Sequence, residues 1–392
     1  MGATTWPPLR YAVAMKWMRI IGVCLFLVLC VGSWRWMAQT SAAVVEVSEE
    51  DRALAAEQAG SGLMVTREGL QPASLNAARE LYEPADLEAA RESLATALTD
   101  TSPGDADEGA LHVLQSVVTR RLKDADAALE HGRRGAELLP ASGDAHHVYS
   151  RAIAEQMRVG GMMAAMKNMQ PWLAELRMSI ELDPSNVTAR SEEIFFLGFI
   201  PKLLGGNPDL AKERIAGLAT VDEPTALSLE ATLVGHLEDP AAGCERGAAA
   251  IVKYPENTGL ALTHGILLEK LATTMELPDE KSALCTQADG EFVRAMGGER
   301  DGTYHRALYR RAQLRIDHEF DLDTAQTLLD DYLADLPRGE MLASAGRIHW
   351  RKGQIHALQG DDDKARVAYT QALEIEPELA EAAKALEALT AE

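Results

Sequence analysis

The residue types best able to bind a metal ion are spread along this sequence rather than gathered. Its ten histidines occur without a His-Glu-x-x-His or Cys-x-x-Cys spacing, the arrangements that hold zinc. His146 and His147 are adjacent, so on a helix they would point about 100° apart. His349 and His356 are seven residues apart, too far to share one ion. We expect structural or solvated roles for all four.

Four methionines form the densest sulfur cluster of the chain: Met162, Met163, Met166 and Met169. Thioethers at helical spacing are soft ligands that suit Cu(I). Methionine also fills irregular apolar gaps, as an inserted helix packed on its neighbour would require. We favour the packing role and predict no metal site here.

The acidic residues from Asp317 to Asp323 alternate as in a calcium-binding loop. Leu322 occupies the position that needs glycine and Leu328 that of the bidentate glutamate, so capping and turn roles are expected instead. The Gly205-Gly206 pair lacks the Lys-Ser/Thr of a phosphate-binding loop, and no Gly-x-Ser-x-Gly motif occurs. The sequence therefore predicts a protein that is not an enzyme and needs no cofactor.

Composition restricts the class of partner. The chain has 392 residues, of which 47% are hydrophobic and 25% charged, so a wholly disordered chain is excluded. Sixty acidic against 38 basic residues leave a net charge of −22, which argues against binding nucleic acid through its phosphates. An acidic surface keeps an extended chain soluble and favours basic partners.

An apolar run at residues 20–34 precedes the acidic body of the chain. Basic residues lie before it, acidic residues follow from Glu46, and small residues around Ala43 suit a cleavage site. The run is either a cleaved signal peptide or a retained membrane anchor. In both cases we expect the body to be periplasmic, or held at the periplasmic side of the inner membrane. Met15 is an alternative start to Met1.

One spacing recurs along the body: a small or apolar residue, a second four residues on, a third three further, and a proline five beyond that. Steps of four and three put three side chains on one helical face, and the proline ends the helix. The clearest copies are Ala128-Gly132-Gly135-Pro140, Trp172-Leu176-Ser179-Pro184, Gly243-Gly247-Ala250-Pro255, Ala325-Leu329-Tyr332-Pro337 and Ala365-Tyr369-Ala372-Pro377. Ala90-Leu94-Ala97 and Ala211-Ile215-Leu218 are copies with a late proline, and Ala283-Gln287-Gly290 is a degenerate copy without one.

Each of these helices follows another amphipathic stretch of about a dozen residues, and no stretch shows the alternation of a β-strand. We therefore predict an all-α fold of about eight helix–turn–helix units. The organisation we expect is a signal peptide or anchor at 1–43, a linker at 44–71, helical repeats at 72–377 and a capping helix at 378–392.

The last unit, 346–379, resembles a tetratricopeptide repeat, with Gly353, Gly360, Ala365 and Pro377 at the expected positions. The longer units resemble a divergent group of exported bacterial tetratricopeptide proteins, on the evidence of Leu182-Asp183-Pro184-Ser185-Asn186 and Gly205-Gly206. The resemblance implies a right-handed superhelical solenoid in which the first helix of each pair lines a concave groove.

The resemblance implies that the second, fifth, ninth and twelfth positions of a repeat face the partner in this groove. A tryptophan flanked by arginine and glutamine has the composition of a binding hot spot, although Trp350 could equally pack between units. Trp350 and Gln354 replace the lysine and asparagine of the chaperone-tail clamp, which disfavours that function. The tentative partner-binding residues are Arg120, His147, Arg151, Phe195, Arg310, Gln313, Arg347, Trp350 and Gln354, with the smaller Ala307, Ile316 and Ala357 beside them.

We accordingly predict a non-catalytic scaffold that binds a peptide or protein, binds no nucleic acid, and touches a membrane only through an uncleaved N-terminal segment. The alternative is an accessory ligand-capture or assembly subunit of a transporter or envelope complex, which a closed pocket lined by Arg120, Arg151 and Phe195 would favour. Cys244 and Cys285 occupy similar positions in successive second helices. They either form a disulfide in an oxidising compartment or remain two buried thiols.

Overall fold

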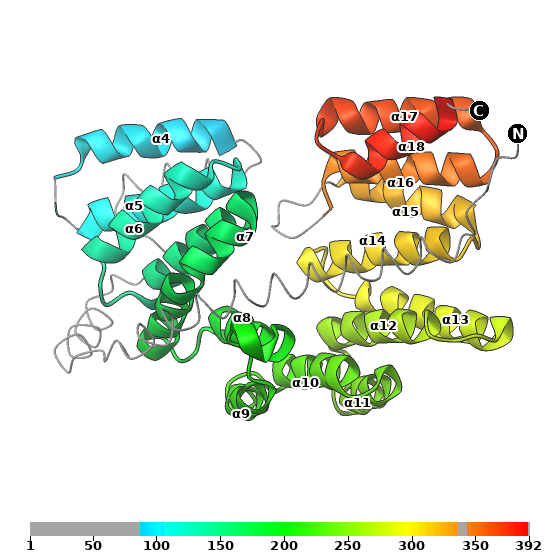
Figure 1. The fold of residues 1–392 in the computed structure, drawn as a ribbon, viewed down its shortest axis with the longest axis horizontal. Coiled ribbons are helices and arrows are strands. Elements are labelled where there is room, and N and C mark those ends of the chain that lie inside the picture. Colours follow the sequence, from blue (N-terminus) through cyan, green and yellow to red (C-terminus); the bar gives the residue numbers. More distant parts are fainter. Residues whose placement is uncertain (1–86, 103, 105, 336–342, 391–392) are drawn as a thin grey trace, which may run out of the picture. The chain divides into compact units, whose positions relative to one another are not determined.

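The computed structural model describes residues 87–102, 104, 106–335 and 343–390, all within the compact unit Ala53–Glu392. These residues form fifteen α-helices and one short 3-10 helix, and they contain no β-strand. The all-α prediction is therefore confirmed (Figure 1). The expected signal or anchor and the linker lie outside the described residues. None of the described helices is both long and apolar enough to cross a bilayer.

The helices form consecutive pairs, as predicted. The first helices are α5 (Ala106–Arg121), the first half of α7 (Gly143–Leu182), α8 (Val187–Phe199), α10 (Glu223–Leu237), α12 (Thr258–Ala272), α14 (Gly302–Asp317) and α16 (Ala345–Leu358). The second helices are α6 (Ala125–Leu138), the second half of α7, α9 (Pro208–Leu218), α11 (Pro240–Lys253), α13 (Pro278–Ala295), α15 (Leu322–Ala334) and α17 (Asp362–Ile375). At the ends, α4 (Leu87–Asp100) is a second helix whose expected partner lies before the described residues, and α18 (Ala380–Thr390) follows the last pair.

Local sequence explains where the helices begin. Asp124, Asn207, Asp239 and Asp361 each accept a hydrogen bond from a backbone N–H of the first turn, at α6, α9, α11 and α17. Proline opens α9, α11 and α13, where its missing N–H costs nothing. The chain therefore marks helix starts with acidic, amide and proline residues, independently of the apolar rhythm.

Each second helix packs against its own first helix and against the first helix of the next pair. Neighbouring first helices also touch one another, from α8 through α10, α12 and α14 to α16. The first helices thus form a continuous layer, while the second helices cover its other side. This is the packing of a helical-repeat solenoid, in which no pair could bury its apolar face alone.

The recurring four–three spacing marks the buried face of the second helices. Ala128, Leu176, Ala211, Leu329 and Ala372 are all fully buried. The degenerate copy at Ala283-Gln287-Gly290 was the wrong choice, because Ala283, Gln287 and Gly290 are exposed. The buried face of α13 is instead Ala288-Phe292-Ala295, which has the same steps of four and three. This copy has no proline to mark its end, and the spacing of small residues alone did not show which residues of α13 face the core.

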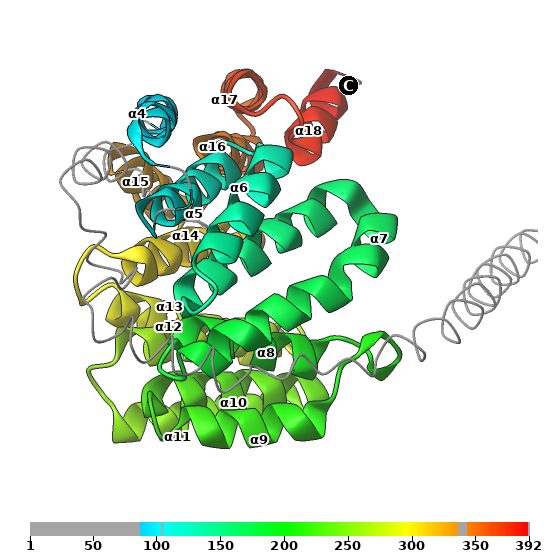
Figure 2. The same cartoon turned by 90° about the vertical axis from the view of Figure 1, so that its left-hand side faces the viewer.

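The pair formed by α7 carries an insertion that the sequence had indicated. Gly161 adopts φ 64° and ψ −156°, outside the helical region, so α7 is two helices joined at a sharp kink. Figure 2 shows the second half folding back beside the first. A residue with a Cβ would be strained at this φ, which explains the glycine.

Close contact between paired helices depends on missing side chains. A Cβ added to Gly353 of α16 would lie 2.4 Å from Cε1 of Tyr369, a buried residue of α17. Likewise, a Cβ on Gly243 of α11 would lie 2.6 Å from the Cα of Gly235 in α10. The glycine at the eighth position of the last unit is therefore a packing requirement.

We expect Gly353→Ala to lower the midpoint of thermal unfolding, followed by circular dichroism. Overpacking a core contact costs about 1–3 kcal/mol, which outweighs the roughly 1 kcal/mol that alanine gains over glycine in a helix. Gly290→Ala is the matched control, because an added Cβ there meets no atom within 4 Å. That variant should be at least as stable as the parent. Equal midpoints for the two variants would contradict the close-packing account.

Candidate functional site

An open cavity of about 480 Å³ lies where α14 and α16 meet, beside α12. Its wall includes four arginines, two tyrosines and no acidic residue. The chain as a whole carries a net charge of −22, so a wall with only basic charges is unusual for it. We call this cavity the arginine pocket; it is lined by Ile266, His305, Arg306, Tyr309, Arg310, Gln313, Tyr332, Ala343, Arg347 and Arg351.

The four arginines come from two pairs in equivalent places. Arg306 and Arg310 are four residues apart on α14, and Arg347 and Arg351 repeat this spacing 41 residues later on α16. Residues four apart share a helical face. Because α14 and α16 are neighbouring first helices, the two faces meet and gather all four guanidinium groups.

The turn after α14 explains why this equivalence is hard to find in the sequence. Glu319 and Gly360 end the two first helices with positive φ, and they are also 41 residues apart. The turn between α14 and the N-cap of α15, Asp321, is one residue longer than the turn between α16 and the N-cap of α17, Asp361. Equivalent positions of the second helices are therefore 40 residues apart. Arg351 is therefore equivalent to Arg310, and Tyr309 rather than Arg310 is equivalent to Trp350.

Carboxylates behind the pocket orient three of the arginines. Arg351 Nη1 donates to Asp317 Oδ1 at 2.7 Å, and Arg310 Nη2 lies 3.4 Å from Glu269 Oε2. Arg347 lies 3.7 Å from Glu381. None of these three carboxylate residues is among those that line the pocket.

The pocket also contains positive charges that repel one another and a buried hydrogen-bond donor without a partner. Burial lowers the pKa of the Arg306 guanidinium, and the charge of Arg310 lowers it further. The Nε of Arg351 is buried without a hydrogen-bond partner. Repulsion between neighbouring guanidinium groups and an orphaned buried donor would both be relieved by an anionic group in the cavity.

Five predicted partner-binding residues lie in or beside the arginine pocket. Arg310, Gln313 and Arg347 line it, and Gln354 accepts a hydrogen bond from Arg351 at 2.9 Å. Trp350 is half-buried and packs against the cluster of Ala372, Leu379 and Ala382. The Arg351 guanidinium lies 4.5 Å from the centre of the Trp350 ring. Trp350 therefore packs between units, and it supports the pocket through Arg351.

The other predicted residues lie on earlier helices, away from this wall. His147 and Arg151 of α7 both bind Glu192 of α8, at 3.2 and 2.9 Å. Phe195 is 48% exposed and stacks on Phe199, with ring centroids 4.7 Å apart. Arg120 is half-buried on α5, and Ala357 is half-buried on α16. Ala307 and Ile316 are buried core residues, so their assignment to a groove was wrong.

Seven pocket residues were not predicted from the sequence: Ile266, His305, Arg306, Tyr309, Tyr332, Ala343 and Arg351. The detectable signal was the repeated Arg-x-x-x-Arg on successive first helices. Aligning the units with one fixed repeat length hides this signal. The turn after α14 is one residue longer, so equivalent residues of α14 and α16 are 41 positions apart rather than 40.

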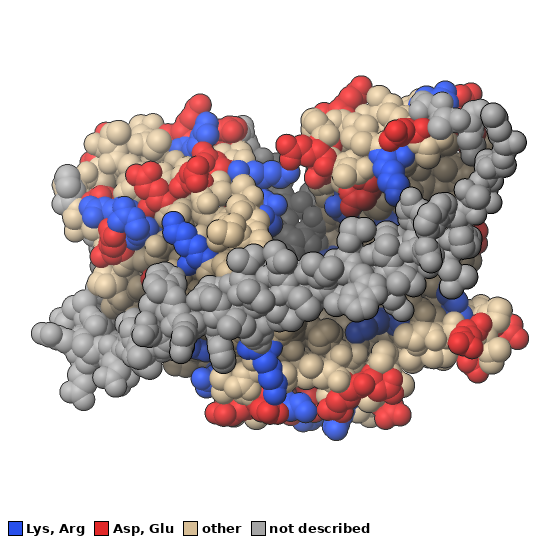
Figure 3. Space-filling model, viewed as in Figure 1, with Lys and Arg blue, Asp and Glu red and all other residues tan. Residues whose placement is uncertain are grey.

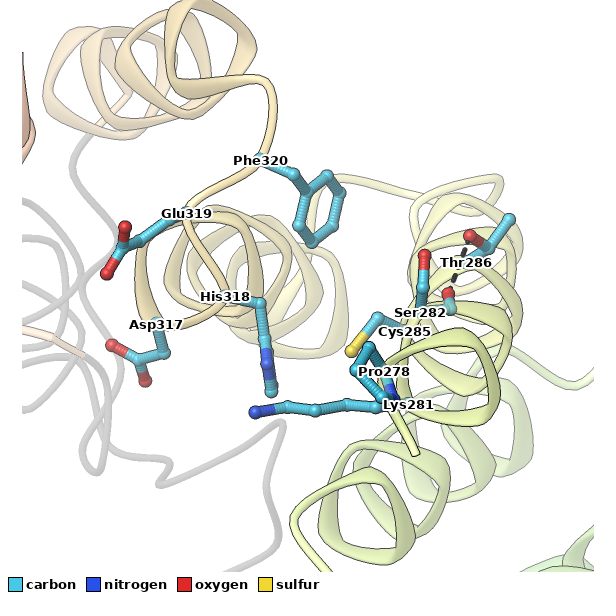
Figure 4. A pocket seen from close by; sticks show the side chains of 9 residues that line it. All are labelled: Pro278, Lys281, Ser282, Cys285, Thr286, Asp317, His318, Glu319 and Phe320. Atoms are coloured by element: carbon cyan, nitrogen blue, oxygen red, sulfur yellow. Dashed lines mark hydrogen bonds between the residues drawn. The ribbon is translucent and has the colours of Figure 1, made fainter. Parts of the chain in front are cut away.

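A second cavity, of about 430 Å³, lies between α13 and the turn after α14 (Figure 4). It brings Cys285, Lys281 and His318 together. Burial and the charge of Lys281 lower the pKa of His318, while burial raises that of the Cys285 thiol. Both shifts oppose a thiolate–imidazolium pair, and Figure 4 shows the Asp317 and Glu319 carboxylates pointing away from the sulfur. The cavity therefore lacks the electrostatics of a cysteine nucleophile.

Both cysteines in the described part of the chain, Cys244 and Cys285, are buried free thiols. Of the two alternatives considered, the structure has the unpaired one. The disulfide proposal depended on taking Ala283 as the repeat position in α13. Since that position is Ala288, Cys285 lies three residues before its repeat position, whereas Cys244 lies one residue after Gly243. The difference is just over one helical turn, so the two cysteines are not equivalent.

The structure confirms the expected role of the acidic run, and confirms that of the methionine cluster only in part. Asp321 caps α15 and pairs with Arg315, so the turn role expected for the acidic run is confirmed. Met169 packs on the core of α7–α10, but Met162 and Met163 are exposed, so the packing prediction holds for only part of the methionine cluster. No group of three or more His, Cys, Asp or Glu side chains suited to a metal occurs among the described residues.

One histidine pair was not anticipated. The Nδ1 atoms of His112 on α5 and His131 on α6 lie 2.8 Å apart, within hydrogen-bond distance. Such a contact needs at least one neutral ring, because two imidazolium groups would offer only donors. Burial lowers the pKa of both histidines, and the charge of His112 lowers that of His131 further. Glu108 opposes the shift at His112, as Glu130 and Asp124 do at His131.

Comparison with known proteins gives no match to a family model or to a curated protein. Among solved structures, the chain is similar to a human IFIT1 dimer with PPP-AAAA, at 16% identity over 81% of this chain and 72% of that one, with a TM-score of 0.49. It is similar to a tetratricopeptide repeat protein of Parabacteroides merdae, at 12% identity over 81% and 97%, with a TM-score of 0.42. A thermophilic tetratricopeptide protein of Thermus thermophilus gives 19% identity over 50% and 97%, with a TM-score of 0.39.

At these identities and TM-scores, the similarity gives no information on the function of this chain. The helix pairs, the close glycine in the last unit and the contacts between successive pairs agree with the resemblance expected from the sequence. The fold is that of a tetratricopeptide repeat array. Its pairs run from α5 to α17, with α18 covering the end of the last pair.

We expect the stability of the repeat array to fall as the pH is lowered from about 7 to 5. A histidine whose folded-state pKa is depressed binds fewer protons folded than unfolded, so its contribution is lost as the pH falls through about 6.5. Urea unfolding at several pH values should show this slope, and a His112→Asn, His131→Asn variant should reduce it. Burial also lowers the pKa of His318, His349 and His356, so the slope should not vanish. Identical slopes would refute a role for the pair.

We expect Cys244 and Cys285 to react slowly with iodoacetamide at pH 8 in the folded chain. Burial raises the pKa of Cys244 to about 11 and raises that of Cys285, so little thiolate forms. Peptide mass spectrometry should show both becoming alkylated quickly once urea is added. A disulfide-linked peptide pair in the unreduced sample would contradict the free-thiol assignment.

Proposed function

We propose that this protein is a non-catalytic scaffold that holds an acidic segment of a peptide or protein partner in the arginine pocket. The observation that carries the proposal is the gathering of four arginines, without a lining carboxylate, on two neighbouring first helices. Guanidinium groups recognise carboxylates through paired, charge-assisted hydrogen bonds. The partner we infer is therefore acidic at the contact, although the net charge of the chain had suggested a basic one.

The pocket is prepared for such a partner before binding. Arg310, Arg347 and Arg351 are each held by a carboxylate behind the wall, which reduces the side-chain entropy lost on binding. Among the described residues, no carboxylate pairs with Arg306, and the charge of Arg310 acts on it, so an incoming anion would relieve the repulsion between these two groups. Tyr309 supplies an aromatic wall beside these charges.

A partner longer than one side chain fits the continuous layer of first helices. Phe195 on α8 is an exposed aromatic residue of that layer, and it stacks on Phe199, whose ring lies 4.6 Å from that of His236 on α10. Exposed aromatic residues are frequent anchors in protein interfaces. The arginine pocket would thus hold the acidic part of a segment whose apolar part contacts α8 and α10.

The setting we propose is the periplasm or the periplasmic surface of the inner membrane. It is supported by the apolar run at 20–34 and by the acidic residues after it. We also propose that the partner is not nucleic acid. The PPP-AAAA of the human IFIT1 structure belongs to that protein, whereas the net charge of −22 here disfavours the long-range attraction of a phosphate backbone.

A second candidate function is capture of a small anionic ligand by an accessory subunit of a transporter or envelope complex. The size of the arginine pocket favours it, because about 480 Å³ falls within the range of small-molecule sites. Arg120, Arg151 and Phe195, which the sequence had suggested for this role, do not line the arginine pocket.

We expect a fluorescent peptide of consecutive aspartates and glutamates to bind the full chain, with Arg306→Ala and Arg347→Ala each weakening binding about tenfold or more. A charge-assisted hydrogen bond contributes about 1.5–3 kcal/mol. Fluorescence anisotropy measures the affinity, and the same peptide with asparagine and glutamine tests the charge. Arg366→Ala is the matched control, because Arg366 lies on a second helix, outside the pocket.

The competing ligands give distinct outcomes in the same assay. Citrate that binds when the peptide does not would favour the small-ligand function. Oligoadenylate that binds as tightly, with the same arginine dependence, would refute the choice of a protein partner. Affinity for the peptide that is unchanged in both arginine variants would remove the arginine pocket as the site.

A further inference from the structure

The insertion in α7 ends in a group of exposed apolar side chains. Val159 is 59% exposed, Met162 61% and Met163 78%, on both sides of the kink at Gly161. We call residues 156–170 the methionine tip. Single exposed apolar residues are common on soluble proteins, but three in five positions at the end of a projecting helix pair form a patch.

The charges around this patch have one sign. Residues 156–170 contain Arg158 and Lys167 and no aspartate or glutamate, in a chain with 60 acidic residues. Arg158 and Lys167 are exposed. Glu155, at the base of the tip, is largely buried and already pairs with Arg158. Because Glu155 offsets the charge of Arg158, Lys167 gives the methionine tip its net positive charge, and the tip is an apolar surface with a positive charge on an acidic protein.

A second connection has the same character. Residues 200–207, which join α8 to α9 through the 3-10 helix η1 (Lys202–Leu204), contain Lys202 and no acidic residue. Lys202 and Leu204 are exposed. Both connections join the first and second helices of successive pairs, so they emerge at the same edge of the array, on the right in Figure 2.

We propose that this edge, the methionine tip together with η1, rests on the surface of an anionic phospholipid bilayer. Flexible thioether side chains can enter the boundary between headgroups and acyl chains, while lysine and arginine pair with the anionic headgroups. The charge pattern favours this occupant over a second copy joined tip to tip, since that contact would bring Arg158 and Lys167 of one copy against the same residues of the other. Contact with another face of a second copy is also disfavoured, because no comparable apolar patch occurs among the other described exposed residues. Val252, for example, is 84% exposed, but beside it lies the ion pair of Lys253 and Glu223.

The contact would add to the N-terminal segment, which the sequence had suggested as the only membrane contact. It also differs from the proposed function, because the arginine pocket is on α14 and α16 and takes no part in it. Gly161 would allow the sharp kink that places the methionines at the end of the helix pair, since this backbone conformation needs a residue without a Cβ.

The test uses the full chain with the photoreactive amino acid p-benzoylphenylalanine at Met163 or, as a control, at Val252. The protein is mixed with vesicles of phosphatidylcholine and phosphatidylglycerol, irradiated, and examined by mass spectrometry for lipid adducts. The comparison is between the yields of lipid adduct at two positions of the same folded chain. Attachment of the chain to the vesicle by an N-terminal anchor alone would not produce a preference for position 163. We expect at least tenfold more lipid adduct at 163 than at 252.

We also expect Arg158→Gln and Lys167→Gln each to reduce the adduct at 163 about fivefold, as does replacing phosphatidylglycerol by phosphatidylcholine. Equal yields at 163 and 252, or yields that do not depend on phosphatidylglycerol, would overturn the proposal. So would cross-linked dimers at 163 without lipid adduct, which would show that a second copy covers the tip. Thermal unfolding of each variant checks that the fold is retained.

Discussion

Side-by-side burial of short helices is the constraint on which the structure depends. Each pair leaves an apolar face that only the next pair can cover, and the two helices within a pair must also approach closely, so small or closely fitting residues are needed where helices meet. Gly353 beneath Tyr369, and Gly265 beneath Phe292, show the same solution in two units, since in each a missing Cβ admits an aromatic ring. The continuous layer of first helices, and with it the arginine pocket, is a consequence of this packing.

The local charge of a binding surface in this protein differs from the net charge of the chain. Acidic and basic side chains are interspersed over the described helices on the face in Figure 3, and many form ion pairs. The net charge of −22 suggested a basic partner, yet the arginine pocket and the methionine tip have walls without a carboxylate. A sum over the chain describes solubility and long-range attraction, whereas recognition depends on the few charges that line a cavity.

The repeat architecture separates two kinds of surface. Side chains on neighbouring first helices converge on the pocket between α14 and α16. Insertions between first and second helices project from the edge, where extra residues such as those around Gly161 leave the packing of the pairs intact. A groove and an edge can therefore carry different partners in one chain.

The sequence by itself determined the helices and their order. Proline, N-caps and the four–three rhythm are local signals, and seven predicted second helices lie where they were expected, from Ala90 to Ala372. The phase of α13, the state of Cys244 and Cys285, the meeting of Arg306 with Arg347, and the exposure of Met163 were decided only by the tertiary structure. Each depends on the length of a turn or on which neighbour covers a face, and these relations join residues about 40 positions apart that no local pattern connects.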